Sequence, residues 1–401
     1  MSKILLTTFT GFPTQMTGGP NKIIYEILSK LDYRNNSVTY FSKNYHKTFS
    51  AFSRSNYSVD SVQLSKSGLG KYFYRNSKAY RKVVTTPFYL NYHYREARKS
   101  FEDFSTSHFN FNIIHAHDVL SLYYFKDHPA KKILTIHSKG PIIDDLKDYH
   151  SGSDLMKNWY SRFNIMEDEA IKAADVITFP SVEAKKLFLD KKNEIDESKV
   201  KIIYNGIDIE KIKQLSNSEN SLNDYGIKEN HDLLLLNVAD HIKVKNISSI
   251  IKAVHYLKRE NVRNPLLVNV GIGPETNYLQ EMISEMKLED NVILLGLLSN
   301  DEIIKFMNYF DYFIMASDRV VFDIVILEAM ACGMIVIANN NGGNKEIIEN
   351  GFNGYLLNEI RAEEIANVVM EANEGCRAQA KNSAEQFDSS IMVREYEMLY
   401  Y

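Results

Sequence analysis

The sequence is poor in cysteine and contains no long apolar run. Its 401 residues include only two cysteines, Cys332 and Cys376, too few for a disulfide framework or a cysteine-rich zinc site. No uninterrupted apolar stretch reaches the roughly 18–20 residues that a membrane span requires. The first twelve residues lack the charged region, long apolar region and cleavage site of a signal peptide. We therefore expect a cytoplasmic protein whose contact with any membrane is peripheral.

An excess of basic charge is also lacking. The formal net charge is −4, from 47 basic and 51 acidic residues, which gives no global argument for nucleic-acid binding. Hydrophobic residues make up 44% of the chain and charged residues 24%, as in soluble globular proteins. At roughly 100–200 residues per domain, the length predicts two or three domains with well-formed cores.

Short apolar runs alternate with helical patterns twice along the chain. In the first half we predict a helix at residues 21–31 and strands at 3–8, 37–41, 112–116 and 132–136. In the second half we predict helices at residues 247–258 and 328–332 and strands at 232–238, 266–270, 292–295, 312–315 and 334–338. This alternation favours parallel sheets with helices on both faces. It predicts two doubly wound α/β domains whose ligands bind at the carboxyl ends of the strands.

The boundary between the two predicted domains falls near residues 204–213, ahead of a polar stretch with weak periodicity. We assign residues 1–205 to an N-terminal domain and residues 206–380 to a C-terminal domain. Residues 381–401 have a helical pattern and end in aromatic side chains. We expect this last segment to pack back on the N-terminal domain.

Several short motifs follow one another along nearly the whole chain. The second half carries, in order, residues 327–333 (LEAMACG), 335–338 (IVIA), 342–348 (GGNKEII) and 350–356 (NGFNGYL). The first half and the boundary carry residues 18–20 (GGP), 115–118 (HAHD), 174–177 (ADVI) and 205–208 (NGID). Each motif alone is a weak signal, but their joint order resembles that of family 4 glycosyltransferases.

This resemblance implies both a fold and a function. The fold is α/β, with two facing Rossmann-like domains (GT-B) and an interdomain cleft, the N-terminal domain on the acceptor side and the C-terminal domain binding the donor. The function is that of a hexosyltransferase-type glycosyltransferase in bacterial surface glycan or glycoconjugate synthesis. It moves a sugar, with retention of configuration, from a nucleotide-sugar donor to a glycan, lipid-linked or protein acceptor. We expect a UDP-linked donor and no other cofactor. The alternative is a catalytically degenerate GT-B subunit that binds glycan or a partner protein.

The resemblance also places donor-binding groups in the C-terminal domain. Glu328 matches the family glutamate that holds the donor ribose; the other interpretation is a solvated carboxylate near a helix start. Lys245 falls at the position of a phosphate-binding lysine, and Lys243 lies two residues earlier. Gly342 and Gly343 either bring backbone N–H groups to the diphosphate or form a plain strand-to-helix turn. Backbone N–H groups and lysines stabilise phosphate charge, and a carboxylate accepts hydrogen bonds from ribose hydroxyls.

In the N-terminal domain, the resemblance places Gly18 and Gly19 in a loop over the diphosphate and acceptor. A simple tight connection is the alternative. His137 ends a predicted strand, at a position where the family has a histidine that faces the sugar. With Lys245 and Glu328 it is therefore a predicted catalytic residue. The alternative is a histidine that is only packed or solvated. His115 and His117 lie two apart and share a strand face, but no carboxylate or cysteine cluster completes a metal site. We therefore predict no metal.

The sequence departs from the family pattern at two positions. Val320 stands where the family has a glutamate that contacts the donor sugar, and Asp240 replaces a family arginine. At about 4 Å and an effective dielectric near 20, an acidic group beside a diphosphate costs on the order of 4 kcal/mol. Either the donor sits differently, nearby cations compensate, or donor chemistry is lost. Asp318 or Asp323 is a candidate replacement for the glutamate, and Asp323 is also placed to cap a helix.

Residues 71–99 combine eight basic residues and one acid with interleaved aromatic side chains. A basic amphipathic segment of this kind attracts anionic lipid headgroups, and its aromatic side chains suit the membrane interface. This pattern gives the predicted acceptor or membrane residues Lys71, Arg75, Arg81 and Lys82, and it adds an anionic membrane surface to the candidate partners. The other interpretation is a pair of basic helices that cover the sheet with their aromatic side chains in the core. We predict no nucleic-acid partner.

Overall fold

The structure is a computed structural model of the chain. It describes residues 2–9, 19–43, 45–49, 87–105, 110–144, 157–192, 195–217, 222–227, 230–260 and 264–401. The chain divides into two compact units, of which the first comprises Met1–Tyr204 together with Met392–Tyr401. The second unit comprises Asn205–Ile391.

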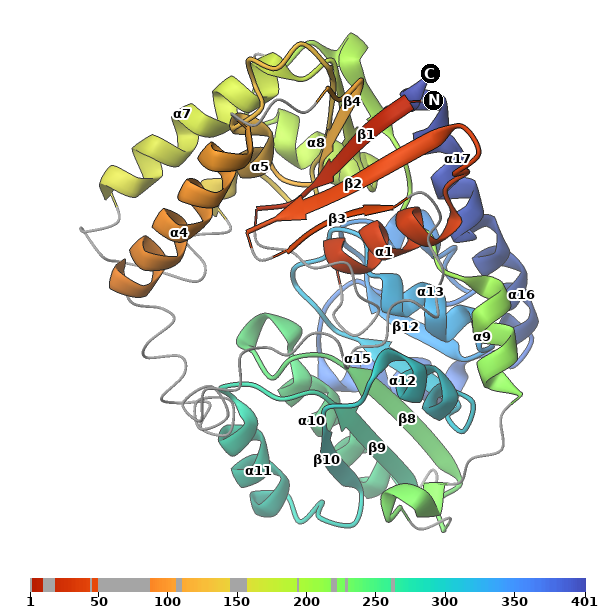
Figure 1. Cartoon of the computed structure of the whole chain (residues 1–401). Coiled ribbons are helices and arrows are strands. Elements are labelled where there is room, and N and C mark those ends of the chain that lie inside the picture. Colours follow the sequence, from red (N-terminus) through yellow and green to blue (C-terminus); the bar gives the residue numbers. More distant parts are fainter. Residues whose placement is uncertain are drawn as a thin grey trace. The chain divides into compact units, whose positions relative to one another are not determined.

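The first unit is built on a seven-stranded sheet of order β3-β2-β1-β4-β5-β6-β7 (Figure 1). Its strands are β1 (Ser2–Thr7), β2 (Asn36–Ser42), β3 (Tyr45–Phe49), β4 (Ile113–Ala116), β5 (Lys131–Thr135), β6 (Val176–Phe179) and β7 (Val200–Ile202). All neighbouring strands run parallel except β3, which runs antiparallel to β2 at the edge. The predicted strands of this half are confirmed within one residue at each end. Their apolar runs are continuous because a parallel sheet is covered on both faces.

Helices surround this sheet, and the last of them comes from the end of the chain. They are α1 (Pro20–Lys30), α4 (Pro87–Ser105), α5 (Val119–Tyr123), α7 (Lys157–Ala173), α8 (Val182–Leu189) and α17 (Ser389–Tyr400). Helices α4 and α7 lie side by side (Figure 1). They meet at Tyr94, whose ring centroid lies 5.0 Å from that of Trp159 and 5.4 Å from that of Phe163. A buried aromatic contact of this kind holds two helices together through apolar area and ring geometry.

Helix α17 binds the first unit through polar as well as apolar contacts. The Tyr400 hydroxyl lies 2.8 Å from Nδ1 of His115, and Lys131 donates a hydrogen bond of 2.7 Å to the carbonyl of Leu399. Tyr396 and Tyr400 are almost completely buried. The segment that joins the first unit therefore begins inside α17, while the preceding helix, α16 (Cys376–Ala384), belongs to the second unit.

The second unit contains a six-stranded parallel sheet of order β10-β9-β8-β11-β12-β13. The strands are β8 (Leu233–Val238), β9 (Pro265–Val270), β10 (Val292–Gly296), β11 (Tyr312–Met315), β12 (Ile335–Asn339) and β13 (Tyr355–Leu357). Its α-helices are α9 (Ile209–Ser216), α10 (Ile247–Arg259), α11 (Thr276–Glu285), α12 (Asn300–Met307), α13 (Ile324–Ala331), α14 (Asn344–Ile347), α15 (Ala362–Glu371) and α16. The sequence predicts five of these six strands, and the short strand β13 lies outside that prediction.

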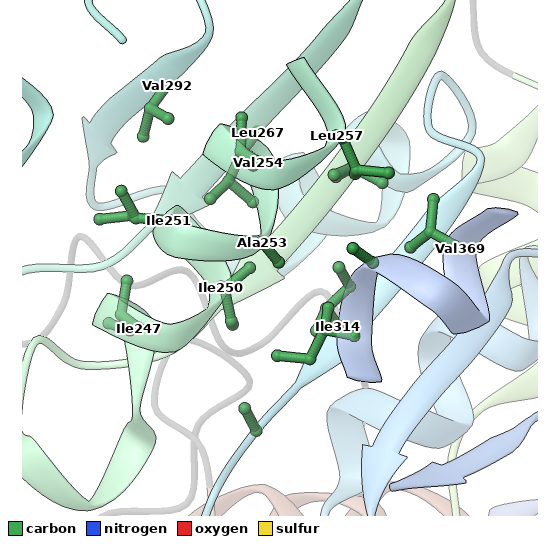
Figure 2. Packing of buried hydrophobic residues seen from close by; sticks show 14 of the residues in the cluster. Ile247, Ile250, Ile251, Ala253, Val254, Leu257, Leu267, Val292, Ile314 and Val369 are labelled. Atoms are coloured by element: carbon green, nitrogen blue, oxygen red, sulfur yellow. The ribbon is translucent and has the colours of Figure 1, made fainter. Parts of the chain in front are cut away.

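The core on one face of this sheet is centred on α10. Figure 2 shows Ile247, Ile250, Ile251, Val254 and Leu257 on one side of α10, directed toward residues of the neighbouring strands. All five are at most 3% exposed. Complete burial of each such side chain contributes roughly 1.5–3 kcal/mol, so this helix is fixed by its apolar stripe and holds the loop before it in place.

The NGID motif lies where the chain passes from the first unit to the second. Ile207 donates a hydrogen bond of 2.9 Å to the Phe387 carbonyl, and Ser389 donates one of 2.7 Å to the Ile207 carbonyl. A Cβ on Gly206 would lie 2.5 Å from the Cα of Ser389, so a side chain is excluded there. Asp208 accepts a hydrogen bond from the backbone of Lys211 and caps α9. The motif thus has a structural role in pairing two crossing segments.

Candidate active site

The strand order of the second unit locates its ligand edge. From β8 the chain continues to β9 on one side, and later returns to place β11 on the other side. In open α/β sheets, ligands bind outside the carboxyl ends of the strands at such a reversal. The predicted donor residues follow the three strands on this side: Lys243 and Lys245 after β8, Glu328 after β11, and Gly342 and Gly343 after β12. The fold therefore brings all the loops that carry them to one edge of the sheet.

Hydrogen bonds connect these loops directly. The Asp318 backbone donates to the Val244 carbonyl at 2.9 Å. Asn246 donates from its side chain to the Asp318 carboxylate at 2.7 Å. The turn after β12 joins the same network, because Gly343 donates to the Val321 carbonyl at 3.1 Å. The three loops therefore form one connected framework.

The predicted phosphate lysines lie in a single 3-10 turn, Lys243–Lys245, which precedes α10. Lys243 is exposed and Lys245 is partly buried. Neither forms an ion pair with another residue that the structure describes. No carboxylate in the described part of the chain therefore competes with an anion for these ammonium groups, and a lysine is suited to bind phosphate as a point charge.

A chain of buried polar groups fixes the backbone just before this turn. His241 contacts Thr276 through Nδ1 at 2.7 Å and contacts Asn269 through Nε2. Asn269 donates a hydrogen bond of 2.6 Å to Asn237, which in turn donates one of 2.7 Å to the Ile314 carbonyl. These groups connect three neighbouring strands, so the lysine turn begins from a rigid support.

Glu328 is the fifth residue of α13 and is only 3% exposed. The expectation that it begins the helix is wrong, and so is the alternative of a solvated carboxylate near a helix start. Its Oε1 accepts a hydrogen bond of 3.0 Å from the side chain of Asn300. A buried carboxylate needs such donors, so Glu328 is held in a defined position within the second unit.

Asn300 is not among the residues that the sequence predicted for the site. It is the first residue of α12, where Ser299 and Glu302 form a capping box. The pattern of serine followed three residues later by glutamate predicts a helix start at Asn300. Its contact with Glu328 could not be found this way, because the two residues are brought together only by the packing of α12 against α13.

Gly342 and Gly343 are required by packing whether or not they bind a ligand. Gly342 has a positive φ of 53°, and a Cβ on it would lie 2.1 Å from the Val320 carbonyl oxygen. A Cβ on Gly343 would lie 2.7 Å from the Val321 carbonyl oxygen. The interpretation as a strand-to-helix turn therefore accounts for both glycines, and their contact with a donor stays a prediction.

The two departures from the family pattern have different surroundings. Val320 is 1% exposed and belongs to the core. Asp240 is exposed. The interaction energy of two exposed unit charges 4 Å apart is closer to its value in water, about 1 kcal/mol, than to 4 kcal/mol. The predicted repulsion of a diphosphate by Asp240 is correspondingly smaller. Asp323 occupies the N-cap position of α13 but forms no side-chain cap hydrogen bond, so its expected capping contact is wrong.

The strand order of the first unit also reverses, between β1 and β4. The Asp118 carboxylate accepts hydrogen bonds from the backbone of Phe9, after β1, and of Ser121, in α5, both at 2.7 Å. His117 follows β4, and His137 lies two residues beyond the end of β5. Gly19 precedes α1 with a positive φ of 68°. The described part of the predicted N-terminal site therefore lies at the carboxyl edge of this sheet.

The histidines do not form the metal pair that their spacing suggested. His115 uses both ring nitrogens, contacting Tyr400 at 2.8 Å and Thr135 at 2.7 Å. His117 instead contacts His137, with 3.0 Å between Nδ1 of the first and Nε2 of the second. Among the residues that the structure describes, no group of three histidine, cysteine or acidic side chains is arranged to hold a metal.

Burial keeps these rings neutral. It lowers the pKa of His115 to about 3, that of His137 to about 4, and that of His117 well below its ordinary value. Burial also raises the pKa of Asp118, against the hydrogen bonds from Phe9 and Ser121. At neutral pH the partly buried His137 can therefore offer a hydrogen bond to an uncharged group such as a sugar hydroxyl, without adding positive charge.

Five predicted site residues lie outside the described residues: Gly18, Lys71, Arg75, Arg81 and Lys82. Within the basic aromatic stretch, Tyr94 is 6% exposed and packs in the core, as the alternative interpretation of that stretch requires. No helix within the described part of the chain is both long and apolar enough to cross a membrane.

Solved structures place this architecture in a known class. Anabaena HepE in complex with UDP aligns with 99% of this chain and 99% of its own, with a TM-score of 0.67 and 17% sequence identity. WaaG, a glycosyltransferase involved in lipopolysaccharide biosynthesis, aligns with 98% of each chain at a TM-score of 0.68 and 14% identity. These likenesses concern the fold, and they confirm the GT-B class with its two parallel-sheet α/β domains.

The sequence comparisons give the family. The model named Glycosyltransferase Family 4 matches residues 17–211, and the model named Glycosyl transferases group 1 matches residues 217–387. N-acetyl-alpha-D-glucosaminyl L-malate synthase of Bacillus anthracis is 27% identical over 298 residues, which are 71% of this chain and 74% of the relative. An N-acetylgalactosaminyltransferase of Campylobacter jejuni, whose named substrate is a diphospho-undecaprenol glycan, is 30% identical over 208 residues, 50% and 53% of the two chains. The chain belongs to the family 4 glycosyltransferases, as its motifs predicted.

Proposed function

We propose that this glycosyltransferase uses a UDP-linked sugar and transfers it, with retention of configuration, to a glycan or lipid-linked acceptor of a bacterial surface. Three kinds of observation support the proposed donor and the proposed glycan product. HepE has been solved with UDP and with UDP-glucose, relatives are named for amylovoran and colanic acid biosynthesis, and the second unit offers cationic and acceptor groups at one sheet edge. A protein acceptor is the further alternative.

The observation that carries the proposal is the surroundings of Glu328. A carboxylate that is 3% exposed and held by Asn300 at 3.0 Å lies in the helix after β11. The loop before that helix is hydrogen-bonded to the lysine turn. A carboxylate that accepts ribose hydroxyls and a lysine that binds phosphate are the two groups that a nucleoside diphosphate requires.

In the proposed reaction, the bond between the anomeric carbon and the β-phosphate oxygen breaks, and the diphosphate leaves with both electrons. Lys245, assisted by Lys243, stabilises the negative charge that develops on this leaving group. The acceptor hydroxyl then bonds to the anomeric carbon on the same face and transfers its proton to a β-phosphate oxygen of the leaving diphosphate. His137, being neutral, contributes a hydrogen bond to the sugar and no charge. These steps require no cofactor besides the nucleotide sugar.

Nucleotide binding tests the proposal most directly. We expect UDP, but not every nucleoside diphosphate, to stabilise the protein by about 2.7 kcal/mol at a concentration one hundred times its Kd. Glu328→Gln and Lys245→Ala should each weaken UDP binding by tenfold or more, as about 1.4 kcal/mol per lost contact requires. Lys252→Ala, an exposed change on α10, is the matched control and should leave binding unchanged.

Turnover and stereochemistry complete the test. Release of UDP from UDP-glucose or UDP-N-acetylglucosamine in the presence of a bacterial lipid extract would identify the donor. The anomeric configuration of the isolated product, read by NMR, decides between retention and inversion. If no nucleotide stabilises the chain and no donor releases its nucleoside diphosphate, the proposed enzymatic function is wrong.

A second candidate function is a catalytically degenerate subunit that binds glycan or a partner protein. It is favoured by Val320, which stands in place of the family glutamate and has no side-chain group that could form a hydrogen bond with a sugar. This alternative predicts glycan binding without release of a nucleoside diphosphate from any donor. The turnover experiment therefore separates the two functions.

A further inference from the structure

His117 has an arrangement that the proposed reaction does not use. Its ring is 2% exposed and lies nearly parallel to the ring of His137, at 11° with 5.4 Å between the centroids. Nδ1 of His117 and Nε2 of His137 are 3.0 Å apart. Two neutral imidazoles at this distance share one hydrogen bond, so one ring must donate and the other must accept.

The other nitrogen of His117 decides which ring donates. Its Nε2 is buried and has no hydrogen-bond partner in the structure. His115, whose ring centroid lies 4.3 Å away, cannot serve as a partner because Tyr400 and Thr135 occupy both its nitrogens.

If His137 donated the shared hydrogen bond, His117 would carry its own proton on Nε2. That proton would be a buried N–H group without an acceptor, which is rarer in proteins than an unsatisfied acceptor. If His117 donates instead, its proton is on Nδ1 and its Nε2 is a bare nitrogen. The second arrangement leaves no donor unsatisfied on His117.

The proton of His137 then follows. Its Nε2 accepts from His117, so the remaining proton of the neutral ring is on Nδ1. His137 is only partly buried, and its Nδ1 has no hydrogen-bond partner among the described residues. The lowered pKa values of both rings agree with one proton on each.

We infer that His117 is a positioning residue that holds His137 as the Nδ1–H tautomer, so that His137 offers an N–H donor to an oxygen of the bound sugar nucleotide. The part of this inference that concerns the substrate rests on the proposed function. The part that concerns the tautomer concerns the protein alone. The position of the proton on the His137 ring is thereby set by the buried His117.

Two variants of His117 separate the hydrogen bond from the packing. His117→Asn keeps an amide donor close to the position of Nδ1, whereas His117→Phe keeps a ring of similar shape and removes the donor. In protein labelled with 15N-histidine, two-bond proton–nitrogen correlations distinguish an N–H nitrogen from a bare one. A His137→Gln variant assigns the His137 signals.

We expect the wild type and His117→Asn to show His137 protonated on Nδ1, and His117→Phe to show a mixture or the Nε2–H tautomer. With a nucleotide sugar that the wild type turns over, kcat/KM should fall by roughly two- to tenfold in His117→Phe, the effect of one net hydrogen bond. It should recover in His117→Asn. A role in packing alone would instead leave the His137 tautomer unchanged in both variants.

An Nε2–H tautomer of His137 in the wild type would overturn the inference, as would an unchanged tautomer in His117→Phe. If no nucleotide sugar is turned over, the proposed function fails, and the NMR comparison still decides the tautomer. Retained His115 signals in both variants would show that the sheet around the two rings has kept its fold.

Discussion

The buried histidines make the first unit sensitive to acid, and His115 allows this to be measured. Burial lowers its pKa from 6.5 to about 3. Between these values the unfolded chain binds a proton that the folded protein does not, so stability falls as the pH falls through this window. Above pH 6.5 both states are neutral at this residue, and its contribution does not change with pH.

The magnitude depends mainly on the unfolded chain. At pH 5 an exposed histidine with a pKa near 6.5 is largely protonated, while the folded ring is not. The linkage relation then gives a loss of about 2 kcal/mol at pH 5 relative to pH 8, for any folded pKa below about 4. For a domain whose total stability is about 5–15 kcal/mol, this is a measurable fraction.

We expect the free energy of unfolding to fall between pH 8 and pH 5 by about 2 kcal/mol more in the wild type than in His115→Gln. His117, His137 and Asp118, whose carboxyl has a raised pKa, are present in both proteins, so their contributions to the pH dependence cancel in this comparison. Trp159 is the single tryptophan of the chain and lies in α7 of the first unit. Its fluorescence during urea denaturation at each pH therefore reports unfolding of the unit that contains His115.

Tyr400→Phe is the matched control for this prediction. It removes the hydroxyl that contacts Nδ1 of His115 and keeps the ring that titrates. It should lower stability at pH 8 by about 1–3 kcal/mol, because a buried nitrogen loses its partner, while retaining the acid-induced loss of the wild type. Parallel pH profiles for the wild type and His115→Gln would show that His115 does not have a lowered pKa in the folded protein.

Three further predictions concern the second unit. Gly342→Ala places a Cβ 2.1 Å from a backbone oxygen and should lower the free energy of unfolding by about 3 kcal/mol or more. Gly351→Ala is the control, because Gly351 also has a positive φ but faces open space, and it should lower this free energy by only about 1 kcal/mol. Urea denaturation of the two variants measures both values. Asn300→Ala leaves the buried carboxylate of Glu328 without this donor and should weaken UDP binding about tenfold, whereas equal Kd values by calorimetry would contradict the positioning of Glu328. Leu257→Ala should destabilise by about 2–5 kcal/mol and leave the Kd for UDP unchanged, because it acts through the core and not the site.

The strands that the sequence revealed are local runs rich in apolar or aromatic residues, and the sheets bury most of them on both faces. Strands β8 and β11 are examples, with runs that need no distant partner to be recognised. Strands β3, β6, β7 and β13 were missed because each is short or partly polar and so gives a weak local signal. Their strand character depends on the neighbours that the rest of the fold supplies.

The amino-acid sequence was sufficient for the α/β alternation, for the order of the motifs and for a list of candidate site residues on loops and helices that follow the strands. The surroundings of those residues depend on the tertiary fold. It placed Asn300 against Glu328 from a separate helix, buried Val320, and paired His117 with His137 across two neighbouring strands. Hydrogen bonds of this kind join residues that are 20 to 28 positions apart, and no local pattern specifies such contacts because they arise when separately folded elements pack together.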